Sequence, residues 1–155
     1  MCSSDLKVAI VAEEVARGDA GASVSVLAHL SLGTNTIYRF GNEEQKARLV
    51  PSLASGKGIA AWALTEPGSG SDAAALQTTA TERDGTYFLN GSKMFITNAS
   101  VAESIVVFAT RDRSLGYKGI SAFVVNREVR NSTCQNSSHQ PNSSAALCLK
   151  KKTSR

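Results

Sequence analysis

Trp62-Ala-Leu-Thr-Glu-Pro-Gly-Ser-Gly-Ser71 is the stretch that decides the fold, because a strand runs there into a tight loop of glycine and serine. The segment from Ile59 to Leu64 is apolar enough for a buried strand, and Pro67 and Gly68 end it. The loop that follows exposes backbone amides and small hydroxyls. Such groups suit an anionic ligand, a phosphate for example.

Two known phosphate-binding motifs, the dinucleotide fingerprint and the Walker-type loop, also contain glycines, but neither fits the context of this loop. Gly68-Ser-Gly-Ser-Asp-Ala73 satisfies the dinucleotide fingerprint GxGxxA, but the helical signal after it, Asp72 to Gln77, is about two turns long. A parallel crossover needs a dozen or more residues, and antiparallel strand chemistry resumes at Thr78. A Walker-type loop is excluded because no Lys-Ser/Thr pair follows the glycines. As an alternative to an anion site, the loop could be a plain connection in which Asp72 caps a short helical turn.

Composition indicates one ordinary soluble domain. The chain has 155 residues, 42% of them hydrophobic, and no apolar run of membrane-spanning length. Its N-terminus has neither the pattern of a secretion signal nor that of a transit peptide, so we expect an intracellular protein. Three cysteines, Cys2, Cys134 and Cys148, are too few and too scattered for a disulfide framework or a zinc site.

The positive charge is confined to the C-terminal end. Residues 1–125 carry 11 Lys/Arg against 12 Asp/Glu, whereas the residues after Val125 carry 6 Lys/Arg against Glu128 alone. Residues 126–155 are rich in Asn, Ser, Gln and Lys and show no hydrophobic period. The net charge of +4 therefore describes a tail that we expect to be disordered, and a nucleic-acid partner is not predicted.

The first third of the chain reads as helices. Residues 5–17 place Val8, Val11, Ala12 and Val15 on one stripe, which predicts a helix with one buried face. A second helix is expected over residues 20–32, ending before Gly33, with His29 in it as a satisfied structural side chain. A third helix begins at the capping box Asn42-Glu-Glu-Gln45, and Pro51 is expected to end or break it.

Strands follow the helices. Turn chemistry at Asp84-Gly85 and Asn90-Gly91 separates several of them. Helices first and then a mostly antiparallel sheet make an α+β fold. The strands are expected at Ile59–Leu64, Thr78–Glu82, Tyr87–Asn90, Lys93–Thr97, Ile105–Thr110 and Ile120–Val125.

Two long motifs at a fixed separation carry a family resemblance. They are Thr65-Glu-Pro-Gly-Ser-Gly-Ser-Asp72 and Asn90-Gly-Ser-Lys-Met-Phe-Ile-Thr-Asn98, and they resemble the TEPxxGSD and NGxKxxITN patterns of the acyl-CoA dehydrogenase family. The resemblance covers roughly residues 5–125. It implies part of an N-terminal helical domain in residues 1–57, an incomplete middle β-domain in residues 58–125, and a polar, basic tail outside the family in residues 126–155.

The resemblance implies that these two motifs line FAD. Thr65 would lie on the polar edge of the isoalloxazine, Thr97 near flavin N5, and Ser71 would also contact the acyl-CoA substrate. The family often has Trp where Phe95 stands here, so the aromatic shield is smaller in this chain. The residues expected at the cofactor are Trp62, Ala63, Leu64, Thr65, Glu66, Pro67, Gly68, Ser69, Gly70, Ser71, Phe95, Ile96 and Thr97.

The resemblance further implies α,β-dehydrogenation of an acyl-CoA thioester, with an electron-transfer flavoprotein as the partner that reoxidises the flavin. The parent would be a homotetramer or dimer in the mitochondrial matrix of a eukaryote or in bacterial cytoplasm. We expect no catalytic base in this chain, because in the family it lies in a C-terminal helical domain, and Glu66 is expected to be structural. Missing strands and helices would leave a free sheet edge and uncovered helix faces.

Two alternatives share these motifs. The chain could be a non-catalytic truncated product, or a fragment like an acyl-CoA oxidase, which passes electrons to oxygen. Acyl chain length and branching preference cannot be predicted from these residues, because in the family the acyl pocket is built largely by helices that this chain lacks.

Overall fold

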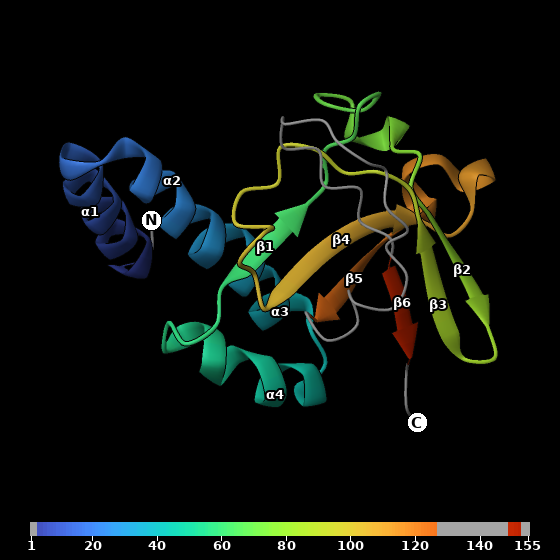
Figure 1. Ribbon diagram of the computed structural model, residues 1–155, viewed down its shortest axis with the longest axis horizontal. Coiled ribbons are helices and arrows are strands. Elements are labelled where there is room, and N and C mark those ends of the chain that lie inside the picture. The colour runs from blue at the N-terminus through green and yellow to red at the C-terminus, as the bar shows by residue number, and fades with distance from the viewer. Residues whose placement is uncertain (1–2, 127–148, 153–155) are drawn as a thin grey trace.

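Helices occupy the first third of the chain and strands the rest, as expected for an α+β fold. The computed structural model describes residues 3–126 and 149–152. Figure 1 shows the first helices at one end of the molecule and the β2–β3 hairpin at the other. The helical elements before the sheet are α1 (Ser3–Gly18), α2 (Ala20–Leu27), the π-helix η1 (Ala28–Thr34), α3 (Asn35–Phe40) and α4 (Glu43–Ala54).

The sheet is mixed. Antiparallel pairs join β2 to β3, β4 to β5 and β3 to β6, whereas β1 runs parallel to β4, and β2 meets β4 in a parallel bridge between Thr79 and Thr110. The strand order is β1-β4-β2-β3-β6, and β5 also pairs with β4. The six strands are β1 (Ala60–Ala63), β2 (Thr79–Arg83), β3 (Thr86–Asn90), β4 (Ser104–Thr110), β5 (Ile120–Asn126) and β6 (Leu149–Lys152).

β4 is the centre of the core, and successive residues along it face opposite sides of the sheet. Ile105 and Val107 join a cluster with Ala61, Ala63 and other strand residues. Val106 faces the other way and joins a second cluster, whose helical members are Ile37, Leu49 and Leu53. The helices α3 and α4 therefore cover one face of β1 and β4.

The helix expected to end before Gly33 continues past it, so that boundary was wrong. The chain passes without a break from α2 through η1 into α3. A Cβ atom on Gly33 would lie 2.5 Å from the Cβ of Ala60. Gly33 therefore serves the close approach of the helix to β1 and does not stop the helix.

His29 is a satisfied structural side chain, as predicted. Its Nδ1 accepts a hydrogen bond from the Ala60 backbone at 2.9 Å, and its Nε2 lies 3.2 Å from the Leu53 carbonyl oxygen. With a backbone N–H facing Nδ1 and a carbonyl oxygen facing Nε2, these contacts fit a ring that accepts at Nδ1 and donates from Nε2. The histidine thus ties the start of β1 to the end of α4.

The capping box at the start of α4 is confirmed. The Asn42 side chain accepts from the Gln45 backbone at 2.8 Å, and the Gln45 side chain accepts from the Asn42 backbone at 3.1 Å. The expectation that Pro51 ends this helix was wrong, since α4 continues to Ala54. Burial explains the extra turn: Leu53 is fully buried and anchors the helix beyond the proline.

The apolar stripe of α1 is only partly covered. Ala12 and Val15 are half-buried, and the Ser23 hydroxyl of α2 donates to the Ala12 carbonyl at 2.9 Å. Val8 and Val11 are exposed, so the expectation of a fully buried face was wrong for this half of the stripe. Uncovered helix faces were themselves expected from the family resemblance.

Part of the tail expected to be disordered forms a strand. Leu149–Lys152 is β6, which pairs antiparallel with β3 in the register Leu89 to Leu149 and Thr86 to Lys152. A free strand edge presents unpaired N–H and C=O groups and accepts another strand readily. The rest of the tail and the cysteines Cys2, Cys134 and Cys148 lie outside the described residues.

Two further classes of site are absent from the described part of the chain. No helix there combines the length and apolar character needed to cross a membrane. No group of three or more His, Cys, Asp or Glu side chains there could hold a metal ion.

Candidate functional site

β1 delivers the glycine loop to one end of the sheet. Trp62 pairs with Val106 across the strands, and its ring meets the edge of Phe108 at 5.0 Å between centroids, with 70° between the planes. Trp62 is half-buried on the helical side of the sheet, whereas Ala63 is buried on the other side. The strand therefore fixes the direction in which the loop leaves.

A tight turn follows, closed by two backbone hydrogen bonds. Glu66 N donates to Ser69 O at 2.9 Å, and Ser69 N donates to Glu66 O at 3.1 Å. The buried Ser69 hydroxyl then donates to the Asp72 carbonyl at 2.8 Å. Glu66 and Ser69 point inward, while Pro67, Gly68, Gly70 and Ser71 stay exposed. Ligand contacts at this corner are thus available to the exposed turn residues and to backbone groups.

The helical signal after the loop is a single 3-10 turn, η2 (Ala73–Ala75). The Asp72 side chain accepts from Ala74 N at 3.2 Å, so Asp72 caps the turn as predicted. β2 begins at Thr79 and pairs antiparallel with β3. The short turn confirms that the glycines do not belong to a dinucleotide-binding crossover.

The second motif, expected as a strand over Lys93–Thr97, is an irregular loop, so that prediction was wrong. Phe95 and Asn98 have positive φ values, 57° and 67°, which reverse the chain direction and prevent a regular ladder. The Met94 amide donates to the Thr65 carbonyl at 3.0 Å. The two motifs, about thirty residues apart in sequence, therefore lie side by side.

A buried ion pair joins the same two motifs. Lys93 Nζ lies 2.8 Å from Glu66 Oε1 and donates to the Leu64 carbonyl at 2.9 Å, and the two side chains are 2% and 3% exposed. Glu66 also accepts from the backbone amides of Gln77 and Thr78. Both carboxylate oxygens of Glu66 therefore accept hydrogen bonds from groups within the protein.

These contacts decide the charge of Glu66. Burial acts to raise the pKa of Glu66, but the Lys93 ammonium and the two backbone amides outweigh it and hold that pKa below its usual range. Burial lowers the pKa of Lys93, and the Glu66 carboxylate offsets part of this effect. The charged form of Glu66 is thus the favoured one, and because its oxygens already accept from Lys93 and from two backbone amides, Glu66 is not available as a proton acceptor for a substrate.

Phe95 projects from the second motif into solvent. Its side chain is 77% exposed although its backbone adopts a strained conformation. A hollow of about 190 Å³ lies beside it, lined among others by Lys93, Ile96 and Asn98. The Asn98 amide donates to the Ser25 carbonyl of α2 at 2.9 Å, while Ile96 packs on the sheet core. The loop is thus fixed on both sides of the exposed ring.

Lys93 and Asn98 are the positioning groups that sequence reasoning missed. Both residues belong to the second motif, but their roles become visible only from their hydrogen-bond partners, which lie 27 and 73 residues away in the sequence. A lysine directly before the apolar run Met94-Phe95-Ile96 was the available signal, because a buried lysine needs a carboxylate.

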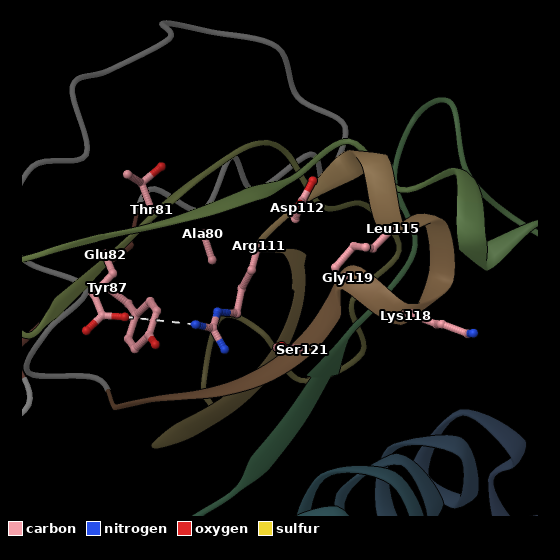
Figure 2. Close-up of a pocket in the computed structure, with 10 residues that line it drawn as sticks. All are labelled: Ala80, Thr81, Glu82, Tyr87, Arg111, Asp112, Leu115, Lys118, Gly119 and Ser121. Carbon is pink, nitrogen blue, oxygen red and sulfur yellow. Dashed lines mark ion pairs between the residues drawn. The ribbon is translucent and has the colours of Figure 1, made fainter.

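A separate hollow of about 470 Å³ lies between the β2–β3 hairpin and the 3-10 segment η3 (Arg113–Gly119), and shares no residue with either motif. Figure 2 shows Arg111 reaching towards Tyr87 and Glu82. The Arg111 guanidinium lies 5.5 Å from the Tyr87 ring centre and 4.0 Å from the Glu82 carboxylate. Its cation is already paired and both signs of charge line the hollow, so no ligand class is selected there.

Comparison with known proteins identifies the family. "Acyl-CoA dehydrogenase, N-terminal domain" matches residues 3–57, and "Acyl-CoA dehydrogenase, middle domain" matches residues 61–151. The chain belongs to the acyl-CoA dehydrogenase family. The two domain matches meet between α4 and β1, where the helices give way to the sheet.

Relatives and solved structures agree with this assignment. The chain is 51% identical over 114 residues to an acyl-CoA dehydrogenase of Bacillus subtilis (strain 168), covering 74% of this chain and 30% of the relative. It is 48% identical over 120 residues to the human mitochondrial short-chain specific acyl-CoA dehydrogenase, covering 77% and 29%. This member of the family thus spans about three-tenths of the length of the relatives it matches.

Two solved structures share the fold. Butyryl-CoA dehydrogenase from Megasphaera elsdenii superimposes with a TM-score of 0.74 at 45% identity, covering 76% of this chain and 31% of that one. A structure described as the FAD complex of PigA superimposes with a TM-score of 0.68 at 43% identity, covering 70% and 28%. That neighbour, which shares the fold of this chain, forms a complex with FAD.

Proposed function

We propose that this chain supplies one wall of the FAD site of an acyl-CoA dehydrogenase. The observation that carries the proposal is the juxtaposition of the two motifs by Met94 and Lys93, with the exposed turn on one side and the exposed Phe95 ring on the other. A ring held exposed in a strained backbone suits a flat aromatic ligand that covers it. The residues assigned to FAD are Trp62–Ser71 and Phe95–Thr97, with Ser71 also facing the substrate.

When bound, FAD would supply the hydride acceptor for the β-carbon of an acyl-CoA thioester whose α-proton is removed by a base. The chain's own residues would bind the flavin and orient it. Exposed backbone groups around Gly68 and Gly70 offer hydrogen bonds to a polar edge, the Thr65 and Thr97 hydroxyls add donors, and the half-buried Ile96 limits water beside the ring.

The proton acceptor is proposed to lie outside this chain. The first motif holds two carboxylates: the Glu66 oxygens are occupied by Lys93 and by two backbone amides, and the Asp72 side chain caps η2 by accepting from Ala74 N. A base must reach the proton that it removes. An electron-transfer flavoprotein as oxidant belongs to the same proposal, as does a mitochondrial or bacterial cytoplasmic location, which is supported by the bacterial and mitochondrial relatives.

FAD binding tests the proposal with a matched pair of phenylalanines. Phe95 is 77% exposed in the second motif, and Phe40 is 81% exposed at the end of α3. In a titration followed by flavin fluorescence, Phe95→Ala is expected to weaken binding at least tenfold, while Phe40→Ala stays within twofold of the wild type. Equal effects of the two variants, or no binding by the unmodified chain, would contradict the proposed site.

Turnover tests the placement of the base. The chain with FAD, butyryl-CoA and an artificial electron acceptor is expected to show no dehydrogenation, because a bound flavin without a base leaves the α-proton in place. Turnover by the 155-residue chain would show that a residue of this chain removes the proton. Binding of FAD without turnover distinguishes the proposal from an inert fragment, which would do neither.

A further inference from the structure

We propose that Lys93 and Glu66 are positioning residues of the flavin site, whose buried ion pair sets the distance between the two motifs that hold the cofactor. This inference rests on the proposed function. Neither side chain faces solvent, so neither charged group is expected to touch the cofactor, and Glu66 belongs to the proposed FAD wall through its backbone alone. They act through the segments that they join.

The geometry shows how much of the site depends on this pair. The Lys93 ammonium donates to the Leu64 carbonyl, directly after β1. It also donates to the Glu66 carboxylate on the tight turn. The same carboxylate holds the backbone amides of Gln77 and Thr78, where the chain returns towards β2. One pair of charges therefore fixes the exit of the first motif, its turn, its return and the start of the second motif.

Stability alone does not explain a pair of this kind. Taking two charges out of water costs several kcal/mol per ion, and a neutral or apolar pair of similar size is often as stable. A buried pair is better attested as a device that fixes one register among several. Register matters at this place, because Lys93–Thr97 has no strand ladder to fix it and reaches the first motif through the Met94–Thr65 hydrogen bond.

Phe95 shows what the register is for. Its backbone at φ 57° is a left-handed conformation that a bulky side chain adopts only under strain. The loop is held two residues before it by Lys93 and three residues after it by Asn98. With the Lys93 contact removed, the strained residue is free to relax, and the exposed ring no longer keeps its position relative to the first motif.

The test uses the full chain and the double variant Glu66→Gln/Lys93→Met, which keeps the side-chain lengths and leaves no unpaired buried charge. The fraction folded, f, is measured by urea unfolding, with Trp62, the single tryptophan, as the reporter. A role in folding alone raises the apparent Kd for FAD by the factor 1/f and no more. A positioning role predicts a further loss of at least tenfold, and a Kd explained by 1/f overturns the proposal.

The matched control is the exposed ion pair of α4. Lys46 Nζ lies 2.9 Å from Glu43 Oε1, nearly the distance in the buried pair, but the Glu43 side chain is 92% exposed. The double variant Glu43→Gln/Lys46→Met is expected to bind FAD within twofold of the wild type. If the buried-pair variant is mostly unfolded, Lys93→Arg replaces it, since it keeps the charge but changes the head group. Its Kd after correction for f is expected to rise at least threefold, and an unchanged value overturns the proposal.

A measurement without FAD separates this inference from the proposed function. The Met94 amide, which donates to Thr65, is expected to exchange its hydrogen at least tenfold faster in the double variant, while the amides of β4 keep their protection. If the wild type binds no FAD, the proposed flavin site fails, and Met94 exchange still decides whether the pair holds the motifs together. Unchanged Met94 exchange overturns the proposal.

Discussion

The first helices and the strands around β4 use their apolar residues in opposite ways. In α1, the side chains of Leu6, Ile10 and Val11 are 49–53% exposed, whereas in β4 Ile105 and Val106 are fully buried. Burial of apolar surface contributes roughly 25 cal/mol per Å². The sheet therefore carries most of the stability of the described residues, and the stripe of α1 contributes fully only when another surface covers it.

The functional motifs lie on the stable side of this division. Both are anchored to β1 and to the sheet core, and the buried ion pair lies between them. A binding wall needs a rigid scaffold, because its donors must keep their positions when the ligand arrives. Perturbing the sheet side should therefore cost more than the same change on the helical side.

The ion pairs give the largest expected contrast. Lys93→Met leaves the Glu66 carboxylate buried without its cation, and we expect a loss of about 3–5 kcal/mol in the free energy of unfolding. Lys46→Met breaks the exposed pair of α4 and should cost less than about 1 kcal/mol. Urea unfolding of both variants measures the difference. Similar losses would mean that the buried pair is hydrated in solution.

Isoleucine truncation compares the two regions with identical chemistry. Ile105→Ala removes a fully buried side chain from β4 and should cost about 2–5 kcal/mol. Ile10→Ala removes a side chain that is 52% exposed in α1, where the cost should stay below about 1 kcal/mol. Thermal and urea unfolding of the two variants measure the difference between these losses. A large loss for Ile10→Ala would reveal that α1 is covered in solution, for instance by a second copy of the chain.

The loss of stability in acid tests how much the buried Glu66 contributes to the sheet region. Its pKa is lower in the folded chain than in the unfolded one, so between these two values the unfolded state binds more protons. The contribution of Glu66 is fully present above the unfolded carboxyl value of about 4.3, and is lost as pH falls through the lower folded value. Unfolding measured from pH 7 down to pH 3 should show this decline, and Glu66→Gln should flatten it. An equally steep decline in Glu66→Gln would assign the acid sensitivity to other carboxylates.

Local signals explain what could be predicted from the sequence. The Asn42 capping box, the Asp72 cap and the apolar run Ile105–Thr110 depend on near neighbours in the chain, and all three are present, the last within β4. The boundaries at Gly33 and Pro51 were wrong because packing against Ala60 and burial of Leu53 outweigh the local preference of glycine and proline.

The candidate site was predictable as two motifs but not as a structure. A strand over Lys93–Thr97 follows from its apolar and β-branched letters, yet the buried Lys93 and the positive φ of Phe95 turn the segment into a loop. The apolar neighbours of Lys93 indicate that it needs a carboxylate, but nothing in the local composition identifies Glu66, 27 residues away, as that partner. Which motif residues face outward also depends on the turn, which hides Glu66 and Ser69 and exposes Ser71.

The smallest predicted effect concerns Asn98, which joins the two regions through the Ser25 carbonyl of α2. Asn98→Gly keeps the positive φ and loses one hydrogen bond, and should cost about 0.5–1.5 kcal/mol. Asn98→Ala loses the same bond and must also hold a left-handed backbone, which adds about 1–2 kcal/mol. The difference between the two unfolding free energies isolates the backbone cost. Equal values would mean that residue 98 leaves the left-handed region once its side chain is released, so that the hydrogen bond to α2 imposes the conformation on the loop.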